Sequence, residues 1–307
     1  MKTIGITGGS GFVGTTLSNL LVNKGYEVVI FTRNKRVKGR QEQVSYSQWD
    51  AEKGIFDSKA LKKTDAIVNL AGAGIADKRW KPQRKKEIVR SRVLGTNFLV
   101  AKLKEHAPHC KTFISASAIG FYGPDMGLHV PFTENAPHYN DFLGNTCEQW
   151  EQAARQAQDF ARTVILRFGI VLGRESGAFP QFAKPMSYGM VPTLGSGGQT
   201  ESWIELTDLA RLIVYALEHD ALSGIYNAVS PTPVSHHELM ETIAKVMGGV
   251  KIPVHVPSAL LKILLGEMST EVLKSCTVSA RKITDAGFTF THPEITEAVR
   301  YILGKEQ

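Results

Sequence analysis

Short apolar runs and amphipathic stretches alternate along the first two-thirds of the chain. The apolar runs are rich in β-branched residues and predict strands over 3–7, 27–32, 43–49, 66–70, 111–115, 163–168 and 225–228. Between them, apolar positions recur at helical spacing over 13–24, 82–105, 145–161 and 207–218. Strands that alternate with helices in this way predict an α/β fold with a parallel sheet and crossover helices.

The pattern changes near residue 174. Glycines and prolines become frequent as far as 204, which predicts loops and a short irregular lobe. Helical spacing returns after that, over 235–247, 260–265, 271–275 and 295–303. We therefore expect one domain over 1–173, with 205–230 returning to its sheet. Residues 174–204 and 231–307 would form a smaller, mainly helical C-terminal substrate lobe.

A glycine-rich turn joins the first predicted strand to the first predicted helix. Its glycines, Gly8, Gly11 and Gly14, have the spacing of a dinucleotide-binding turn. One glycine permits the tight turn, one lets the backbone approach the pyrophosphate, and one lets helix and strand pack closely. The free N–H groups and positive dipole at the start of the helix favour phosphate. The turn therefore predicts a Rossmann-type doubly wound parallel sheet with cofactor contacts from Thr7, Gly8, Ser10, Gly11, Phe12, Val13 and Gly14.

The end of the second predicted strand indicates which dinucleotide is bound. An NAD site usually has Asp or Glu here, to bind the ribose 2′-hydroxyl, whereas this chain has Arg33. A guanidinium can pair with a 2′-phosphate instead, and Asn34, Lys35 and Arg36 would extend the polar, positive surface. The sequence therefore favours NADP(H) over NAD(H).

Residues after the third and fourth predicted strands extend the cofactor site. Asp50 is expected to contact the adenine, and Leu70, Ala71 and Gly72 the ribose and phosphates. Small residues suit this position because they allow a close backbone approach.

The composition is that of an ordinary globular protein, with 43% hydrophobic and 21% charged residues among 307. The apolar runs are far shorter than the roughly 20 residues that cross a bilayer, and the chain starts on a strand, so neither a membrane span nor a signal peptide is expected. Cys110, Cys147 and Cys276 are widely spaced and odd in number, which argues against a disulfide framework or a metal site. A reducing cytoplasm is the expected location.

The formal net charge is +7, and its local distribution matters more than its total. One basic group, over 33–40, lies where a cofactor 2′-phosphate would arrive. The second, over 78–92, is interpreted mainly as a solvated helix face. No nucleic-acid motif accompanies the charge, so we expect a small-molecule substrate and no nucleic-acid partner. A homodimer is a possible assembly.

The motifs together resemble the extended short-chain dehydrogenase/reductase superfamily, which includes the NAD-dependent epimerases and dehydratases. The matching segments are the 7–14 turn, Asn69-Leu70-Ala71-Gly72, Ser115-Ala116-Ser117, Phe121-Tyr122-Gly123, Leu166-Arg167 and the stretch from Gly195 to Asp208. The tail, with Leu265-Gly266-Glu267-Met268 and Ala286-Gly287-Phe288, is similar to one atypical subgroup, the "epimerase family proteins".

The chain departs from that superfamily at its catalytic residues. The resemblance implies a Tyr-x-x-x-Lys pair near residue 145, in which tyrosine exchanges a proton with the substrate and lysine lowers its pKa and holds the ribose. The aligned positions here are Leu143 and Cys147, and Arg92 replaces an upstream asparagine. Leucine exchanges no proton, and a thiol carries no positive charge, so ordinary sugar epimerisation is not supported by these residues. Ser117 matches the remaining catalytic serine.

Several other residues are candidates to replace the missing tyrosine and lysine. Tyr122 is a candidate acid, or a packing residue, and Cys147 is a candidate reactive thiol, or a small buried hydrophobe. Arg92 would contact the cofactor or an anionic substrate, or form a salt bridge on its helix. The remaining positions are His138 and Tyr139 as weak loop candidates, Asp208 as a helix cap or buried acid, and Arg167 as an anchor of the lobe.

Two functions follow from this interpretation. The first is an NADP(H)-dependent oxidoreductase or epimerase-like enzyme that acts on an unidentified small molecule. The alternative is a redox sensor or scaffold protein that binds NADPH without turnover, because the cofactor turn is present while the Tyr and Lys are absent.

Overall fold

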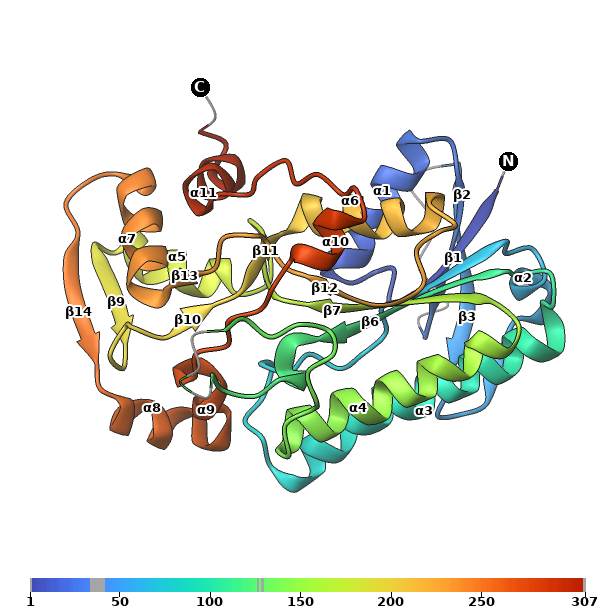
Figure 1. Cartoon of the computed structure of the whole chain (residues 1–307), viewed down its shortest axis with the longest axis horizontal. Helices are drawn as coiled ribbons and strands as arrows, with labels where there is room; N and C mark the ends of the chain where they lie inside the picture. Colours follow the sequence, from blue (N-terminus) through green and yellow to red (C-terminus); the bar gives the residue numbers. More distant parts are fainter. Residues whose placement is uncertain (1, 34–41, 126, 128–129, 306–307) are drawn as a thin grey trace.

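A twisted sheet forms the centre of the larger part of the molecule (Figure 1). The computed structural model describes residues 2–33, 42–125, 127 and 130–305. Within them the sheet has eight strands. In spatial order they are β12 (Gly224–Ala228), β7 (Arg162–Phe168), β6 (Thr112–Ala118), β5 (Ala66–Asn69), β1 (Thr3–Thr7), β2 (Glu27–Thr32), β3 (Val44–Asp50) and β4 (Ile55–Phe56).

The strand order reverses at β1, which places the expected ligand crevice. β1 pairs in parallel with β2 on one side and with β5 on the other, and all five of its residues are buried. Only β4, at one edge, runs antiparallel within this sheet. In open α/β sheets, ligands bind at the carboxyl ends of the strands where the order reverses. The predicted doubly wound α/β sheet is therefore confirmed, and the ligand crevice is expected at the carboxyl ends of β1 and β5.

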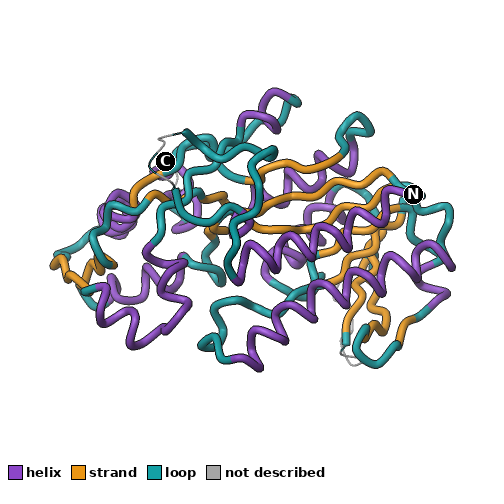
Figure 2. The backbone as a smooth tube through the Cα atoms, turned by 60° about the horizontal axis from the view of Figure 1, so that its bottom comes forward, coloured by secondary structure: helices purple, strands orange, loops and turns teal. Residues whose placement is uncertain are grey.

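Helices cover both faces of the sheet. Helix α1 (Phe12–Asn23) packs against α6 (Leu206–Glu218) on one face, and α3 (Pro82–His106) packs against α4 (Phe142–Arg155) on the other. Figure 2 shows the two long helices α3 and α4 side by side in front of the strands. The short α2 (Ser58–Leu61) precedes β5. Each face of the sheet has its own apolar core, and this two-sided burial explains the continuous apolar strands.

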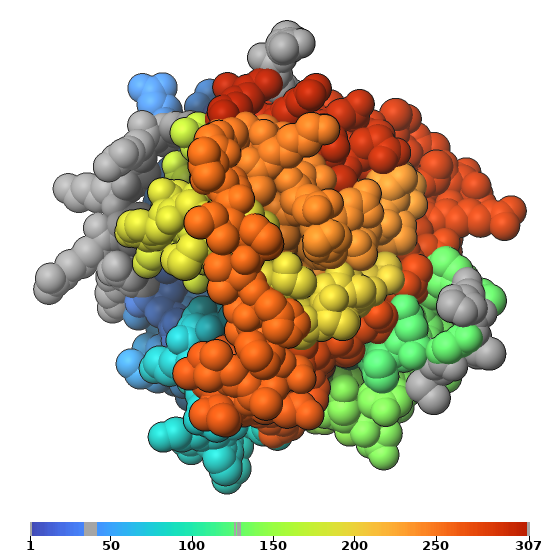
Figure 3. Space-filling view, turned by 90° about the vertical axis from the view of Figure 1, so that its left-hand side faces the viewer, coloured from blue at the N-terminus to red at the C-terminus, as the bar shows by residue number. Residues whose placement is uncertain are grey.

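The C-terminal lobe lies at the other end of the molecule and contains more regular structure than expected. Its helices are α5 (Phe179–Ser187), α7 (His236–Met247), α8 (Ser258–Leu265), α9 (Ser269–Leu273) and α11 (Ile295–Leu303). Helix α10 (Arg281–Asp285) lies apart from them and packs against β12 of the large sheet. The strand pairs of the lobe are β9 (Met190–Leu194) with β14 (Ile252–Val256), β10 (Thr200–Glu201) with β13 (Val234–Ser235), and β11 (Trp203–Glu205) with β8 (Ile170–Leu172). Figure 3 looks onto this end, which β14 and α7 to α9 largely cover.

The expectation of irregular structure over 174–204 was wrong. Pro180 stands in the first turn of α5, where a missing N–H costs no hydrogen bond, so this proline begins a helix. β9 forms because it pairs with β14, about sixty residues further along the chain. No local pattern shows such a pairing.

Of the two roles expected for Asp208, a helix cap or a buried acid, the structure shows the second. Helix α6 begins at Leu206, and Glu205 caps it by accepting hydrogen bonds from the N–H groups of Thr207 and Asp208. Asp208 lies inside the first turn and is 1% exposed. Its carboxylate accepts from the backbone of Thr291, so it serves as the buried acid of the two expected roles.

Among the described residues, no helix is long and apolar enough to cross a membrane.

Candidate functional site

The glycine turn lies at the carboxyl end of β1 and leaves no space for side chains. Gly8 has a φ of 71°, and a Cβ added there would lie 2.8 Å from the carbonyl carbon of Leu70. A Cβ on Gly14 would lie 2.5 Å from the carbonyl oxygen of Gly8 and 2.5 Å from the Cα of Gly9. These contacts are with backbone, which cannot move aside as a side-chain end can. The turn therefore requires glycine for the positive φ and for the approach of α1 to β1.

The start of α1 is open for an anion. Gly11 is the N-cap residue and has no side chain to accept from the first N–H groups of the helix. Ser10 and Gly11 are exposed, while Phe12 and Val13 are half-buried. Unsatisfied N–H groups and the positive end of the helix dipole meet here, which is the arrangement that binds phosphate.

The opposite wall of the crevice is the segment after β5. Leu70 and Ala71 are half-buried and Gly72 is exposed. Just below, Asn69 accepts a hydrogen bond from Thr7 at 2.7 Å and donates to the hydroxyl of Thr96 at 2.9 Å and that of Ser115 at 3.2 Å. These three hydrogen bonds connect β1, β5, β6 and α3 through the Asn69 side chain. The carboxyl ends of β1 and β5 are therefore held by a buried hydrogen-bond network.

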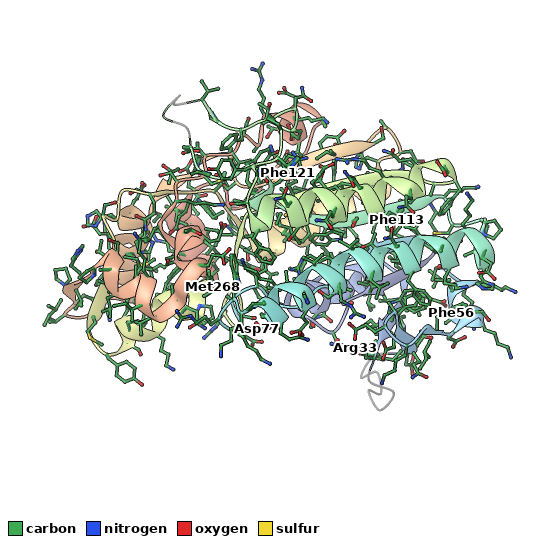
Figure 4. All side chains as sticks on the ribbon, turned by 90° about the horizontal axis from the view of Figure 1, so that it is seen from below. Arg33, Phe56, Asp77, Phe113, Phe121 and Met268 are labelled. Atoms are coloured by element: carbon green, nitrogen blue, oxygen red, sulfur yellow. The ribbon has the colours of Figure 1, made fainter. Side chains whose placement is uncertain are left out.

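The expected adenosine end lies at the carboxyl ends of β2 and β3. Arg33 follows β2 and is exposed, and its charge lowers the pKa of Glu87 on α3, although the hydrogen bond from Arg84 is the larger cause. Figure 4 shows Arg33 at the edge of the molecule beyond α3. Asp50 ends β3, is 9% exposed and accepts from the N–H of Lys53. The predicted contacts Asn34 and Arg36 lie outside the described residues.

Leu143 and Cys147 both lie on the buried side of α4. Leu143 is 6% exposed and packs with Trp80 and Ile88, and Cys147 is 4% exposed. Burial, and after it the nearby Glu151 carboxylate, raise the pKa of the Cys147 thiol to about 12, against the lowering effect of Arg92. Cys147 is therefore a neutral buried thiol at neutral pH, not an activated nucleophile.

The burial of the cysteine thiols predicts how they react with thiol reagents. All three cysteines are free and buried, and burial also raises the pKa of Cys110 to about 11 and that of Cys276 to about 12. Since the thiolate is the reactive form, we expect a thiol reagent at pH 7.5 to label none of them at an appreciable rate in the native protein. In denaturant all three should react rapidly. Fast native labelling that disappears in Cys147→Ser would show that Cys147 is reactive after all.

Ser117 and Tyr122 belong to one buried network centred on Glu151 and Arg167. Ser117 donates to the Glu151 carboxylate at 2.7 Å. Arg167 binds both oxygens of Glu151, at 2.7 and 2.9 Å, and also donates to the Tyr122 hydroxyl at 2.7 Å. The Tyr122 hydroxyl in turn donates to Asn227 at 2.6 Å. All five side chains are at most 2% exposed.

The network occupies the hydroxyl groups that catalysis would need. Burial raises the pKa of Tyr122 to about 12, and its ring stacks on Phe132 with centroids 5.1 Å apart. Arg167 also lies over the ring of Phe121, 3.4 Å from the centroid. These contacts favour the packing role for Tyr122 and an anchoring role for Arg167, and catalysis by Ser117 or Tyr122 stays a prediction.

Two members of this network were missed from the sequence. Glu151 lies in the helix that holds the Leu143 and Cys147 positions, and Asn227 lies on β12, 105 residues from Tyr122 along the chain. The available signal for Glu151 was a carboxylate on the apolar face of a helix, which requires a buried partner. Asn227 had no local signal.

Arg92 lies on α3, beneath the segment after β5. It is 9% exposed, and its Nη1 donates to the carbonyl oxygens of Ala73 at 3.0 Å and Ile88 at 3.2 Å. Its guanidinium lies 5.1 Å from the ring centroid of Trp150 on α4. The helix-surface salt bridge weighed for Arg92 is not formed within the described part of the chain.

The loop candidates His138 and Tyr139 line the segment before α4. Both are exposed, and the His138 ring meets that of Phe121 edge-on at 5.9 Å. Tyr139 packs closely over Gly123, where an added Cβ would lie 2.3 Å from the tyrosine ring. The two side chains therefore hold this loop against the turn after β6.

The lobe meets the α3–α4 end of the sheet domain close to these residues. Met268, after α8, packs with an apolar cluster that includes Trp80, Leu143 and Phe142. Lys85 on α3 forms an ion pair with Glu267 of the lobe. Figure 4 shows Met268 beside Asp77 near the start of α3. The lobe thus packs against Leu143 and its neighbours at this end of the sheet domain.

The described residues contain no cluster of three or more His, Cys, Asp or Glu side chains able to hold a metal ion.

Comparisons with known proteins place this geometry in context. The sequence profile of the NAD dependent epimerase/dehydratase family matches residues 4–228, and that of a domain of unknown function, DUF1731, matches 256–302. The chain is 35% identical to the epimerase family protein YfhF of Bacillus subtilis, over 98% of this chain and 97% of that protein. It is 34% identical to the epimerase family protein SAR0825 of Staphylococcus aureus, over 99% of this chain and 100% of that protein.

A solved structure is similar over the same length. The human epimerase family protein SDR39U1 (isoform 2), crystallised with NADPH, superposes with a TM-score of 0.87 at 29% identity. The match covers 99% of this chain and 100% of that chain.

Proposed function

Because the chain belongs to the NAD-dependent epimerase/dehydratase family, we propose that it binds NADP(H) and acts as an oxidoreductase or epimerase-like enzyme on a small molecule. The family match and the tail match to DUF1731 confirm the resemblance that the glycine turn and the tail motifs indicated. The observation that carries the proposal is the turn at the end of β1. It leaves backbone N–H groups exposed at the start of α1 and has no space for a Cβ at Gly8 or Gly14.

Residues of this chain fit the parts of a dinucleotide. The turn and α1 would hold the pyrophosphate, the segment Leu70–Gly72 would lie along it, and Asp50 would face the adenine. When bound, the nicotinamide supplies or accepts a hydride. The structure related by 29% identity was crystallised with NADPH, which supports the phosphorylated cofactor here.

Arg33 provides the test of cofactor choice. We expect Arg33→Asp to weaken NADPH binding by about 10- to 100-fold, because a charge-assisted pair with the 2′-phosphate contributes about 1.5–3 kcal/mol. NADH binding should change little. Fluorescence titration of both reduced cofactors measures the ratio. Arg281, an exposed arginine on α10, supplies the control variant Arg281→Asp. Equal affinity for NADPH and NADH in the wild type, unchanged by Arg33→Asp, would contradict the NADP assignment.

The rival proposal is an NADPH-binding protein that does not turn over. The observation in its favour is the neutral, apolar character of the Leu143 and Cys147 positions, together with the occupied hydroxyls of Ser117 and Tyr122. Carbonyl compounds and nucleotide sugars should be screened by the absorbance of the reduced cofactor. Tight NADPH binding without oxidation across that screen would favour the sensor or scaffold role, whereas turnover with any compound would favour the enzyme.

A further inference from the structure

The charge of Arg92 is buried and has no anionic partner. No carboxylate of the described residues forms an ion pair with it, and burial is the largest influence on its pKa, which it lowers. Arg84 lies two turns earlier on the same side of α3 and is also buried, but it pairs with Asp77 at 3.1 Å and with Glu87 at 2.7 Å. The two arginines also repel each other. Only one of these two buried cations is therefore neutralised by the protein.

Most of the hydrogen-bonding capacity of Arg92 is unused. Both bonds to described residues come from Nη1, so Nε and Nη2 still have their N–H groups to offer. Cys147 cannot supply the missing negative charge, since its pKa of about 12 keeps the thiol protonated at neutral pH. Burying a cation without a partner is unfavourable, and it is ordinarily offset by an anion or a ligand.

The segment above Arg92 places no side chain on the guanidinium at Gly72. Gly72 is exposed and stands directly over it, and a Cβ added to Gly72 would lie 3.1 Å from Cζ and 3.2 Å from Nη2. The same Cβ would lie 3.3 Å from Nη1, so any larger residue would press on the face of the guanidinium. Glycine at this position therefore leaves that face uncrowded.

Arg92 lies on the opposite face of the sheet from the helix that would hold the pyrophosphate, and it borders the expected cofactor site only at Gly72. The turn and α1 lie on the face of the sheet that α6 covers, whereas Arg92 lies between α3 and α4 on the opposite face. Its neighbours there are Cys147 and Trp150 of α4. This is the end of the crevice where the superfamily's catalytic pair would be.

We propose that Arg92 binds an anionic group of the substrate, so that the substrate is a small organic acid or phosphate ester. Arginine suits this role because its planar fork binds a carboxylate or phosphate through two parallel hydrogen bonds. The inference rests on the proposed function, since it assigns the substrate class of the same crevice. The anion at Arg92 could also be a phosphate of the cofactor, and the experiment below distinguishes a substrate anion from a cofactor phosphate.

The test is to titrate the NADP⁺-saturated protein with acetate, malonate and inorganic phosphate, by calorimetry at constant ionic strength. We expect saturable binding of at least one probe, and a loss of about tenfold or more in affinity in Arg92→Met. Arg90→Met removes an exposed arginine of the same helix and should leave probe binding unchanged. Arg92→Lys keeps the charge without the fork and should retain part of the affinity. NADPH affinity should change less than about twofold in all three variants.

Several results would overturn the proposal. One is a wild type that binds none of the probes, and another is an equal loss in Arg90→Met. A loss of NADPH affinity of about tenfold or more in Arg92→Met, without saturable probe binding to the loaded wild type, would assign Arg92 to the cofactor phosphate. If Arg92→Met does not fold, the comparison of wild type with Arg92→Lys decides. Failure of the wild type to bind NADPH would instead refute the proposed function. Titration of the cofactor-free protein with NADPH and with the probes distinguishes that failure from failure of the Arg92 proposal.

Discussion

Replacing Gly14 with alanine is expected to abolish NADPH binding. The added Cβ would lie 2.5 Å from the carbonyl oxygen of Gly8 and from the Cα of Gly9, so the turn itself must shift. That shift moves the backbone N–H groups that are proposed to hold the pyrophosphate. We expect a loss of affinity of at least about 100-fold, which corresponds to about 2.7 kcal/mol. Fluorescence titration with NADPH measures it.

Gly95 on α3 provides a matched control. It is also a helical glycine, but an added Cβ there meets no atom within 4 Å. Gly95→Ala should bind NADPH like the wild type and be more stable by about 0.5–1 kcal/mol, because alanine loses less entropy in a helix. Thermal unfolding of both variants shows whether Gly14→Ala still folds. If a folded Gly14→Ala binds NADPH normally, the turn is not the pyrophosphate site.

Replacing Arg167 with methionine is expected to give the largest loss of stability. The change leaves the Glu151 carboxylate, whose side chain is 0% exposed, without its bidentate partner. It also removes the donor to the Tyr122 hydroxyl. Breaking a buried pair from one side costs about 3–5 kcal/mol of the free energy of unfolding. Denaturant titration at pH 7 measures the loss.

Arg155 is the natural comparison, because it also binds Glu151, at 2.9 Å, but from a partly exposed position. Arg155→Met should cost only about 0–1 kcal/mol, as for other solvent-accessible pairs. The double variant Arg167→Met with Glu151→Gln should recover part of the loss, since no unpaired carboxylate remains. Equal effects of the Arg167 and Arg155 variants would show that the network does not anchor the fold.

The two substitutions affect different parts of the molecule. The glycine turn is expected to govern binding, and the Glu151–Arg167 pair is expected to govern folding. Ser117 and Tyr122 touch the second part directly. A loss of activity in Ser117→Ala therefore has to be corrected for stability before it is interpreted as catalysis.

The sequence predicted the cofactor turn well because the turn is one contiguous segment. Its glycines, the preceding strand and the following helix lie within residues 3–23, and β1 and α1 were expected within a residue of their observed bounds. The periodicity also placed the other strands of the large sheet except the two-residue β4, because apolar runs and amphipathic helices are local features. Local signals failed over 174–204, where β9 depends on a partner about sixty residues away.

The region around Ser117, Tyr122 and Arg92 is different, because its properties depend on neighbours that are distant along the chain. The sequence by itself determined the Rossmann-type fold, the dinucleotide turn and the absence of tyrosine and lysine at 143 and 147. Only the tertiary structure decided that Ser117 and Tyr122 bond to Glu151, Arg167 and Asn227. It also decided that Arg92, within the described residues, is buried without a carboxylate. The physical reason is that burial and pairing, which set the charge and availability of a group, arise from contacts between segments and are not encoded at any single position.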